Sequence, residues 1–437
     1  MGGGLLQLVA FGAQDVYLTG SPQITYFKVV FKRHTNFAIE SIAQTFSGSV
    51  RYGSKVTAVI SRNGDLLGEL WLESVMTKSE AAGDTFYPAE ALINRVTVEL
   101  GGQELDKLTS TWYRVYDNLY RNNQTDRAAY QTMTDFVDSE ANATTKRFFT
   151  PILFWFCRSP GNYIPLIALQ YHELRVTIDF ASTIAGIDTS DPASLQATLW
   201  ADYVFLDQAE RKKFASQPHE YLIEQTQFTG DENVEVSTAS SKSQQIRLSF
   251  NHPTKLLAWV VADPSTHGKF TGGSAGATAE AFAPLQSAKL MLNGHDRAET
   301  RVGAYYNKVV PYQAAKANPD AGIYYMSFAL SPTQHAPSGS LNLSRIDSAV
   351  LALTFKQATA GATVVSNITT PETTTIADTA NLSALRVFAV NYNVLRVNRH
   401  SAKQLAAFMV QSITMWDKQC KYSALSTSVC NQLVIAA

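Results

Sequence analysis

Hydrophobic and polar residues alternate with a period of two along much of the chain. Val96, Val98 and Leu100 alternate with polar residues, and the same pattern recurs over 173–180 and 349–355. Successive side chains of a strand point to opposite faces, so this alternation predicts strands with one buried and one wet face. Sheets of that kind are antiparallel.

Short motifs occur twice in the same order, which indicates an internal repeat. Phe37-Ala-Ile-Glu40 resembles Tyr221-Leu-Ile-Glu224. The segment Val98-Glu-Leu-Gly-Gly102 resembles Leu290-Met-Leu-Asn-Gly294, and both end in dipeptides that favour two-residue hairpin turns. Four further correspondences keep the same order along both halves: 65–67 with 255–257, Tyr113 and Tyr120 with Tyr305 and Tyr312, Phe180 with Phe355, and Tyr203-Val-Phe-Leu206 with Tyr392-Asn-Val-Leu395. The changing offset predicts insertions within about 120–149 and 355–385.

Each half offers about eight candidate strands. We therefore predict an all-β fold of two consecutive eight-stranded antiparallel jelly rolls, with short helices in the loops and a boundary near 211–219. Helical stripes within 110–121 and near the C-terminus predict packing helices. The strands expected in the first half lie near 37–46, 55–61, 69–77, 94–100, 103–108, 149–156, 173–180 and 198–206.

Composition limits the classes of partner. The 437 residues carry a formal net charge of -1, which argues against direct binding of nucleic acid, since neutralising phosphates requires a surplus of Lys and Arg. Cys157, Cys420 and Cys430 form an odd set without metal-ligand spacing, so we expect free thiols and a reducing compartment. The longest apolar run, at 151–157, is far too short to span a membrane.

No motif predicts catalysis, a metal or a cofactor. Gly272-Gly-Ser-Ala-Gly276 matches the pattern of a nucleophile elbow but lacks the flanking strand and helix that such an elbow needs. The histidines lack the spacing of a metal site. We predict no catalytic, metal-binding or cofactor-binding residues, although scattered carboxylates leave a carbohydrate-binding or carbohydrate-cleaving jelly roll as an alternative. Five Asn-x-Ser/Thr motifs are candidate glycosylation sites: Asn123, Asn142, Asn342, Asn367 and Asn381.

Seven segments carry a family resemblance, in this order: Gly12-Ala-Gln-Asp-Val-Tyr-Leu-Thr-Gly20, Pro22-Gln-Ile-Thr25, Asn36-Phe-Ala-Ile-Glu40, Ser61-Arg-Asn-Gly-Asp65, Pro165-Leu-Ile-Ala-Leu-Gln-Tyr-His-Glu173, Pro218-His-Glu-Tyr-Leu-Ile-Glu224 and Asn391-Tyr-Asn-Val-Leu-Arg396. With them the chain resembles the double jelly-roll major capsid proteins of the nucleocytoplasmic large DNA viruses, particularly the algal-virus branch. The resemblance covers nearly everything up to about Val397.

This resemblance implies a structural protein of the virion capsid rather than an enzyme. It implies homotrimeric, pseudo-hexagonal capsomers that tile an icosahedral shell and are assembled in the host cytoplasm. An N-terminal arm would face minor capsid proteins and the inner viral membrane, without contacting nucleic acid. The outer surface of such capsomers can carry glycans. A minor capsid or scaffolding component of the same fold is the remaining alternative.

The resemblance also divides the chain. We expect an N-terminal arm at 1–26, a first jelly roll at 27–212, a second at 213–397 and a C-terminal extension at 398–437. This extension departs from the family, whose chains end soon after the strand that holds Asn391 to Arg396. It contains a helical stripe and could clamp a neighbouring subunit, bind another capsid component or pack on its own barrel.

Overall fold

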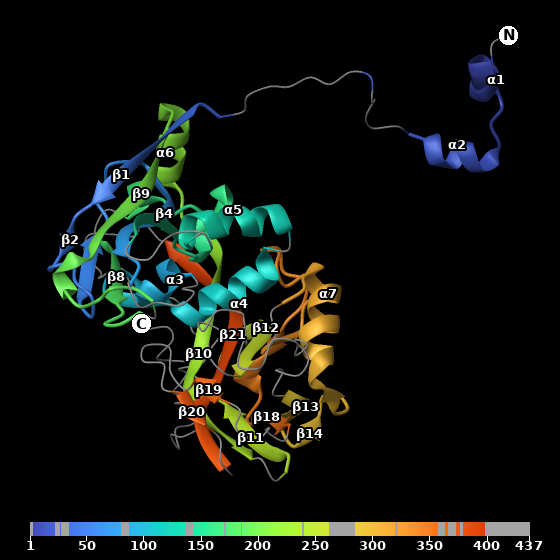
Figure 1. Cartoon of the computed structure of the whole chain (residues 1–437). Helices are drawn as coiled ribbons and strands as arrows, with labels where there is room; N and C mark the ends of the chain where they lie inside the picture. Colours follow the sequence, from blue (N-terminus) through green and yellow to red (C-terminus); the bar gives the residue numbers. More distant parts are fainter. Residues whose placement is uncertain are drawn as a thin grey trace, which may run out of the picture.

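The computed structural model describes residues 3–21, 27, 35–79, 87–121, 123–136, 144–169, 172–184, 186–237, 240–261, 285–319, 322–356, 363–365, 373–375 and 379–397. Two β-barrels dominate it, one above the other in Figure 1, with the N-terminal helices apart from both. Neighbouring strands in the described sheets pair in antiparallel orientation, as the alternating pattern predicts.

The first barrel consists of two sheets in jelly-roll order. Strands that follow one another in the chain are distributed between the sheets, so each sheet pairs strands that are distant in sequence. One sheet has the order β1 (Phe37–Gln44), β9 (Gln196–Leu206), β4 (Leu66–Thr77), β7 (Thr145–Pro151). The other has the order β2 (Phe46–Ser47), β3 (Lys55–Val59), β8 (Leu174–Phe180), β5 (Ile93–Leu100), β6 (Gln103–Thr109).

The second barrel repeats this order. One sheet runs β10 (His219–Ser237), β21 (Thr379–Val397), β12 (Pro253–Val261), β16 (Ile323–Ser327), with β17 (Leu341–Asn342) beside β12. The other runs β11 (Lys242–Leu248), β18 (Ala349–Phe355), β13 (Leu285–Leu292), β14 (His295–Asp296), with β15 (Arg301–Val302) beside β13. A separate hairpin pairs β19 (Thr363–Val365) with β20 (Thr373–Thr375).

Helices occupy the N-terminal segment and the connections between strands. They are α1 (Gly3–Val9), α2 (Ala13–Thr19), α3 (Pro88–Leu92), α4 (Ser110–Tyr120), α5 (Gln124–Thr134), α6 (Gln208–Ser216) and α7 (Val310–Ala315), which continues the π-helix η7 (Tyr305–Val309). Single 3-10 turns are η1 (Trp155–Cys157), η2 (Pro160–Asn162), η3 (Leu166–Ala168), η4 (Pro192–Ser194) and η8 (Leu343–Arg345). The predicted helix at 110–121 is confirmed as α4, which lies between the barrels in Figure 1.

The internal repeat corresponds to equivalent strands. Its motifs fall on β1 and β10, at the starts of β4 and β12, at the ends of β8 and β18, and on β9 and β21. The two hairpin turns also match: Gly101, Gly102, Asn293 and Gly294 all have positive φ, at 59°, 85°, 50° and 82°. Two consecutive positive φ values are the requirement of a type I′ turn, which explains why Gly-Gly and Asn-Gly occupy these positions.

Three details differ from the predictions. The strand expected at 149–156 is β7, which ends at Pro151 and is followed by the helical turn η1. Residues 151–157 form a short apolar run, and such a run shows neither the period of a strand nor that of a helix, so the sequence alone does not distinguish the two. The first barrel's sheets hold four and five strands rather than eight in all, since short β2 extends one of them. Among the described helices only α4 was predicted by its residues, and α1, α2, α3, α5, α6 and α7 were not.

Two hydrophobic cores are present, and the core of the first barrel continues across the junction to one face of a sheet of the second barrel. On β12, Leu256, Ala258 and Val260 pack with the first barrel's core, whereas Leu257 and Trp259 point into the second barrel. The sheet formed by β10, β21, β12 and β16 is therefore buried on both faces, which makes the two barrels one packed unit.

Candidate functional site

The junction between the barrels is the most elaborate buried site in the described part of the chain. The ring of Trp112 on α4 lies 5.4 Å from that of Phe388 on β21, which stacks at 4.9 Å on Phe228 of β10. The Tyr325 hydroxyl donates a 2.8 Å hydrogen bond to the Val115 carbonyl. One sheet of the second barrel is thus fixed on α4 by apolar packing and by a directed hydrogen bond.

A buried ion cluster crosses the junction. Glu224 of β10 is 3% exposed, and its Oε2 lies 2.7 Å from Nη1 of Arg158 in the first barrel. Its Oε1 accepts a hydrogen bond from Lys255 Nζ and lies 3.5 Å from His335 Nδ1. Burial alone would raise the pKa of Glu224, but the His335 hydrogen bond and the two cations hold it at about 2. The ionised carboxylate therefore joins a cation from each barrel.

The Arg158 side chain is held rigidly for this contact. Its Nε and Nη2 donate hydrogen bonds of 3.2 and 2.9 Å to the Leu153 carbonyl, and its guanidinium lies 5.1 Å from the centre of the Tyr116 ring. A guanidinium with fixed geometry loses little conformational entropy when it pairs with a carboxylate. Contacts within the first barrel therefore fix the Arg158 guanidinium in the orientation in which it pairs with Glu224.

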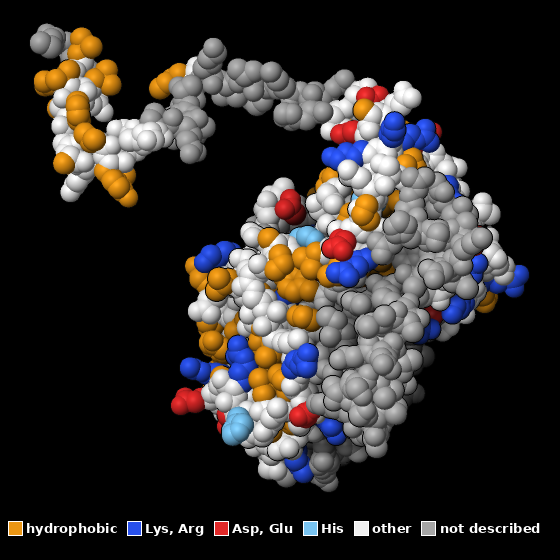
Figure 2. Space-filling model, turned by 180° about the vertical axis from the view of Figure 1, so that it is seen from behind, with side chains coloured by type: hydrophobic (Ala, Val, Ile, Leu, Met, Phe, Trp, Pro, Cys, Tyr) orange, Lys and Arg blue, Asp and Glu red, His pale blue; other side chains and the backbone are white. Residues whose placement is uncertain are grey.

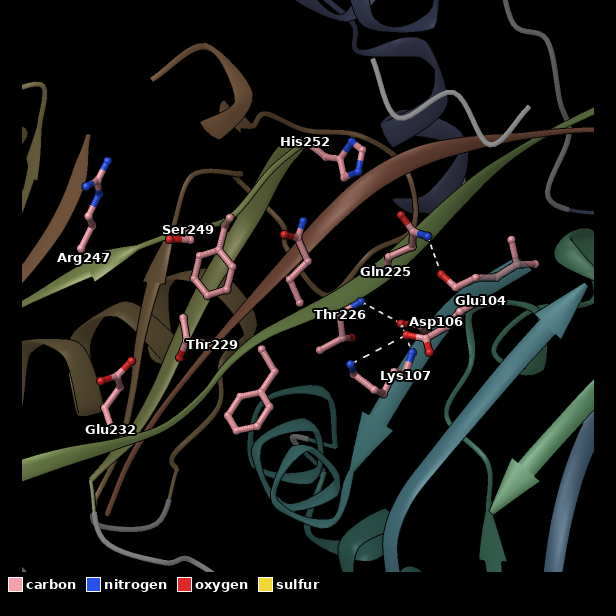
Figure 3. A pocket seen from close by; sticks show the side chains of 14 residues that line it. Glu104, Asp106, Lys107, Gln225, Thr226, Thr229, Glu232, Arg247, Ser249 and His252 are labelled. Carbon is pink, nitrogen blue, oxygen red and sulfur yellow. Dashed lines mark hydrogen bonds and ion pairs between the residues drawn. The ribbon is translucent and has the colours of Figure 1, made fainter. Parts of the chain in front are cut away.

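A pocket of roughly 450 Å³ opens beside the ion cluster, between β6 and β10 (Figure 3). Asp106 Oδ1 accepts hydrogen bonds from the backbone N–H groups of Thr226, at 3.0 Å, and Lys107, at 2.9 Å. Burial raises the pKa of Asp106 to about 7. Because Asp106 accepts hydrogen bonds from backbone groups of both barrels, we infer that it stabilises the packing of β6 against β10.

A second buried charge cluster lies among the helices of the first barrel. Asp117 on α4 is surrounded by three arginines, with nitrogen-oxygen distances of 2.9 Å to Arg121, 3.4 Å to Arg114 and 3.6 Å to Arg127. The Arg121 guanidinium also stacks 3.6 Å from the centre of the Tyr130 ring. This cluster ties α5 to α4.

Glu90 of α3 completes the helical cluster with weaker contacts. Its Oε1 accepts a 2.8 Å hydrogen bond from the Tyr130 hydroxyl and lies 3.8 Å from Arg114 Nη1. Its Oε2 has no hydrogen-bond partner among the described residues. Burial is the largest effect on this group and raises the pKa of Glu90 to about 7.

Two of the candidate glycosylation sites are exposed in the described structure. Asn123 precedes α5, and its side chain accepts a 3.2 Å hydrogen bond from the Thr125 backbone N–H. Asn342 accepts a 3.1 Å bond from the backbone N–H of Ser344 in the same way. The other three are Asn381, in β21 with its side chain not described, and Asn142 and Asn367, outside the described residues.

Other predicted features also lie outside the described residues: Gly272 to Gly276, Cys420, Cys430 and the extension 398–437. Cys157 is a half-buried free thiol. Within the described ranges, no group of three or more His, Cys, Asp or Glu side chains could hold a metal ion.

The N-terminal helices expose an apolar surface. Leu8, Tyr17 and Leu18 are more than three quarters exposed, and Asp15 is the one charged residue between Gly3 and Thr19. Figure 2 shows these hydrophobic side chains apart from the barrels. No helix in the described residues is both long enough and apolar enough to cross a membrane.

Two family models together match most of the chain. The model of the major capsid protein N-terminus matches residues 25–207, and the model of the large eukaryotic DNA virus major capsid protein matches residues 210–402. The chain belongs to this capsid protein family. The recognised resemblance to capsid proteins of large DNA viruses is thereby confirmed.

Relatives of this capsid protein extend over nearly its full length. The major capsid protein of Paramecium bursaria Chlorella virus 1 is 48% identical over 427 residues, covering 91% of this chain and 98% of the relative. That of Pyramimonas orientalis virus is 42% identical, covering 91% and 97%. These relatives are structural proteins rather than enzymes, which confirms the predicted class.

Solved structures confirm the double jelly-roll fold. The capsid protein in the quasi-atomic model of the PBCV-1 virus capsid superposes with a TM-score of 0.76 at 44% identity, over 85% of this chain and 97% of that one. The Faustovirus major capsid protein, 12% identical, superposes with a TM-score of 0.62 over 89% and 95%, a likeness of fold alone. The chain is therefore a major capsid protein of a large DNA virus.

Proposed function

We propose that this major capsid protein forms homotrimers with a pseudo-hexagonal outline, and that these capsomers tile an icosahedral shell. The observation that carries the proposal is the hydrophobic packing across the junction, which joins two barrels of equal topology. Three such chains supply six similar barrels in fixed pairs, so a hexagonal tile needs only threefold symmetry. Flat facets can then be covered by one kind of tile.

The apolar N-terminal helices support a second part of the proposal. An arm at 1–26 would contact minor capsid proteins and the inner viral membrane, because exposed leucine and aromatic side chains favour burial against a partner. We retain the division into barrels at 27–212 and 213–397 and an extension at 398–437. Assembly would take place in the host cytoplasm.

Glycosylation stays a proposal at all five candidate asparagines. Exposure of Asn123 and Asn342 supports access for a modifying enzyme at these two. Intact-mass measurement of protein from virions, followed by Asn→Gln substitution at each site, would identify any modified position.

The solution mass tests the trimer directly. We expect light scattering to give three times 47.9 kDa and to give the same value after dilution to nanomolar concentration. Permanent interfaces of this kind commonly bury more than about 2,000 Å² and survive dilution. A monomer at micromolar concentration would contradict the proposal.

A further inference from the structure

The pocket between β6 and β10 lies along two strand edges. Each of these strands ends the strand order of its own sheet, so each has one edge without a neighbour among the described strands of that sheet. The edges meet where Asp106 accepts the hydrogen bond from the Thr226 N–H. Because the hydrogen bonds of a strand alternate in direction, the backbone groups of Phe228 point to the same side as those of Thr226, toward the pocket. A chain that enters the pocket can therefore bond to the backbone of β10.

The buried carboxylate of Asp106 has room for a further hydrogen-bond donor. Asp106 is 4% exposed, and its two described hydrogen bonds both run to Oδ1. Its Oδ2 has no partner among the described residues. An unsatisfied buried carboxylate oxygen is unfavourable, so a donor that reaches Oδ2 would stabilise the site. An ammonium group suits this position, since it donates a hydrogen bond and carries the opposite charge.

The pocket contains charged side chains of both signs. Figure 3 shows Asp106 and Glu232 on opposite sides of it. Glu104 also lines the pocket, as do the cations Lys107 and Arg247. A fitting occupant therefore carries two amines that are separated along an extended chain, with an acidic group close to them.

One segment of the chain has this composition and is within reach. Asp417-Lys-Gln-Cys-Lys421 holds three of the five Asp, Glu, Lys and Arg residues of the extension 398–437, which lies outside the described residues. Strand β21 ends at Val397, which pairs with His219 at the start of β10. About six residues of strand, or roughly 20 Å, separate His219 from the pocket at Gln225. About twenty residues connect Val397 to the segment, and they cover about 30 Å even at the short rise of a helix.

The distribution of charge along the chain favours the same occupant. Of the 36 Lys and Arg residues and the 37 Asp and Glu residues, four and one lie in the extension, so the rest of the chain holds 32 against 36. The extension is therefore positive and the remainder negative. Opposite net charges attract the extension to the two barrels before any specific contact forms.

We propose that the segment 417–421 of the extension binds in the pocket of its own chain. One of the amines of Lys418 and Lys421 donates a hydrogen bond to Asp106 Oδ2, and the other pairs with Glu232. The backbone of the segment pairs with the free edge of β10 at Phe228. The extension then covers the line along which β6 meets β10 and stabilises the contact between the two barrels.

Disulfide trapping tests this placement, because Cys420 lies inside the segment. Substituting Ser249→Cys puts a thiol at an exposed position that lines the pocket. The matched control is Ser243→Cys, an exposed serine of β11 that lies six residues earlier, roughly 20 Å away. A disulfide requires the two Cα atoms to approach within about 7 Å.

We expect mild oxidation of the purified full chain to link the Ser249→Cys thiol to Cys420 within one chain. The link should form at least about tenfold faster than any link in the control, because a bound segment keeps the two thiols together. Mass spectrometry of the digested protein identifies the linked cysteines, and a denaturing gel without reductant shows whether one chain or two are joined.

A second pair of variants tests the role of the amines. Lys418→Ala with Lys421→Ala, added to Ser249→Cys, should slow the link to Cys420 by about tenfold, since a hydrogen bond between charged groups commonly contributes a factor of this size. Lys418→Arg with Lys421→Arg keeps both charges and should preserve most of the rate. Neither pair changes a residue of the described barrels.

Every other outcome overturns a stated part of the proposal. Absence of a link, a link to Cys430 or Cys157 in place of Cys420, or equal rates in Ser249→Cys and Ser243→Cys would overturn the placement of the segment. A dimer joined through Cys420 would overturn binding within one chain. An unchanged rate after both lysines are replaced by alanine would overturn the role of the amines. These results do not depend on whether the protein forms trimers.

Discussion

Two buried glutamates in this capsid protein show opposite behaviour. Glu224 at the junction and Glu90 among the helices are 3% and 2% exposed, and both lie near an arginine. The pKa of Glu224 is lowered to about 2, whereas the pKa of Glu90 is raised to about 7. Burial penalises the charged form of both side chains, so their partners decide the difference.

The number and closeness of the donors distinguish the two sites. Both oxygens of Glu224 have cationic partners, with Arg158 at 2.7 Å. Glu90 has a neutral donor on one oxygen, Arg114 only at 3.8 Å, and the like charge of Asp117 nearby. Glu224 therefore stays ionised, and its ion pairs with Arg158 and Lys255 stabilise one relative orientation of the two barrels. The helical cluster can hold its glutamate protonated.

Substituting Glu224→Gln should have the largest effect. It leaves Lys255, which is fully buried, without its counterion, and breaking a buried pair on one side costs about 3 to 5 kcal/mol. Urea unfolding of the wild type and the variant measures this loss. The control is Glu224→Gln with Lys255→Met, which removes both charges and should recover much of the loss. If the double variant is less stable than Glu224→Gln, the buried lysine is not the cause.

Substituting Glu90→Gln should change how stability depends on pH. The folded-state pKa of about 7 exceeds the ordinary glutamate pKa of 4.5, so the folded protein binds the extra proton between these values and loses stability as pH rises through them. Relative to Glu90→Gln, the wild type should lose about 2 kcal/mol between pH 5 and pH 8. Unfolding in urea at both pH values checks this. A constant difference between the two proteins would show that Glu90 is charged throughout.

Substituting Tyr325→Phe should have the smallest effect. It removes the hydroxyl that donates to the Val115 carbonyl while the ring remains in the junction, and the net contribution of such a bond is about 1 kcal/mol. The matched control is Tyr306→Phe, which removes a hydroxyl bonded to the Ala288 carbonyl inside the second barrel. Equal losses in urea unfolding would indicate that junction and barrel core unfold together, whereas a separate early transition in Tyr325→Phe would show a weaker junction.

The strands were largely predictable from the sequence, because the alternation of hydrophobic and polar residues and the residues that favour hairpin turns indicate them independently. The alternation over 94–100 coincides with β5, and Gly-Gly and Asn-Gly mark the same hairpin in both halves. Helix α5 carries no comparable signal, since it is mostly polar and begins at a cap formed by Asn123.

The ion cluster could not be predicted, because its members come from distant segments. Arg158 and Glu224 are 66 residues apart, and neither residue's own neighbourhood indicates the other. One signal was available. Lys255 precedes an apolar run at a position where the first half of the repeat has Asp65, and a lysine entering a buried strand requires a counterion.

The two-sided sheet at the junction has a consequence for synthesis on the ribosome. Its strand β21 is the last described strand of the chain and contributes Phe388, which packs on Trp112 of α4. This contact can therefore form only some time after the first barrel has emerged from the ribosome. At about 5 to 20 residues per second, residues 207–397 take on the order of ten to forty seconds to appear. During that interval Trp112 lacks its contact with Phe388, and hydrophobic surface that is exposed in this transient way is prone to aggregation.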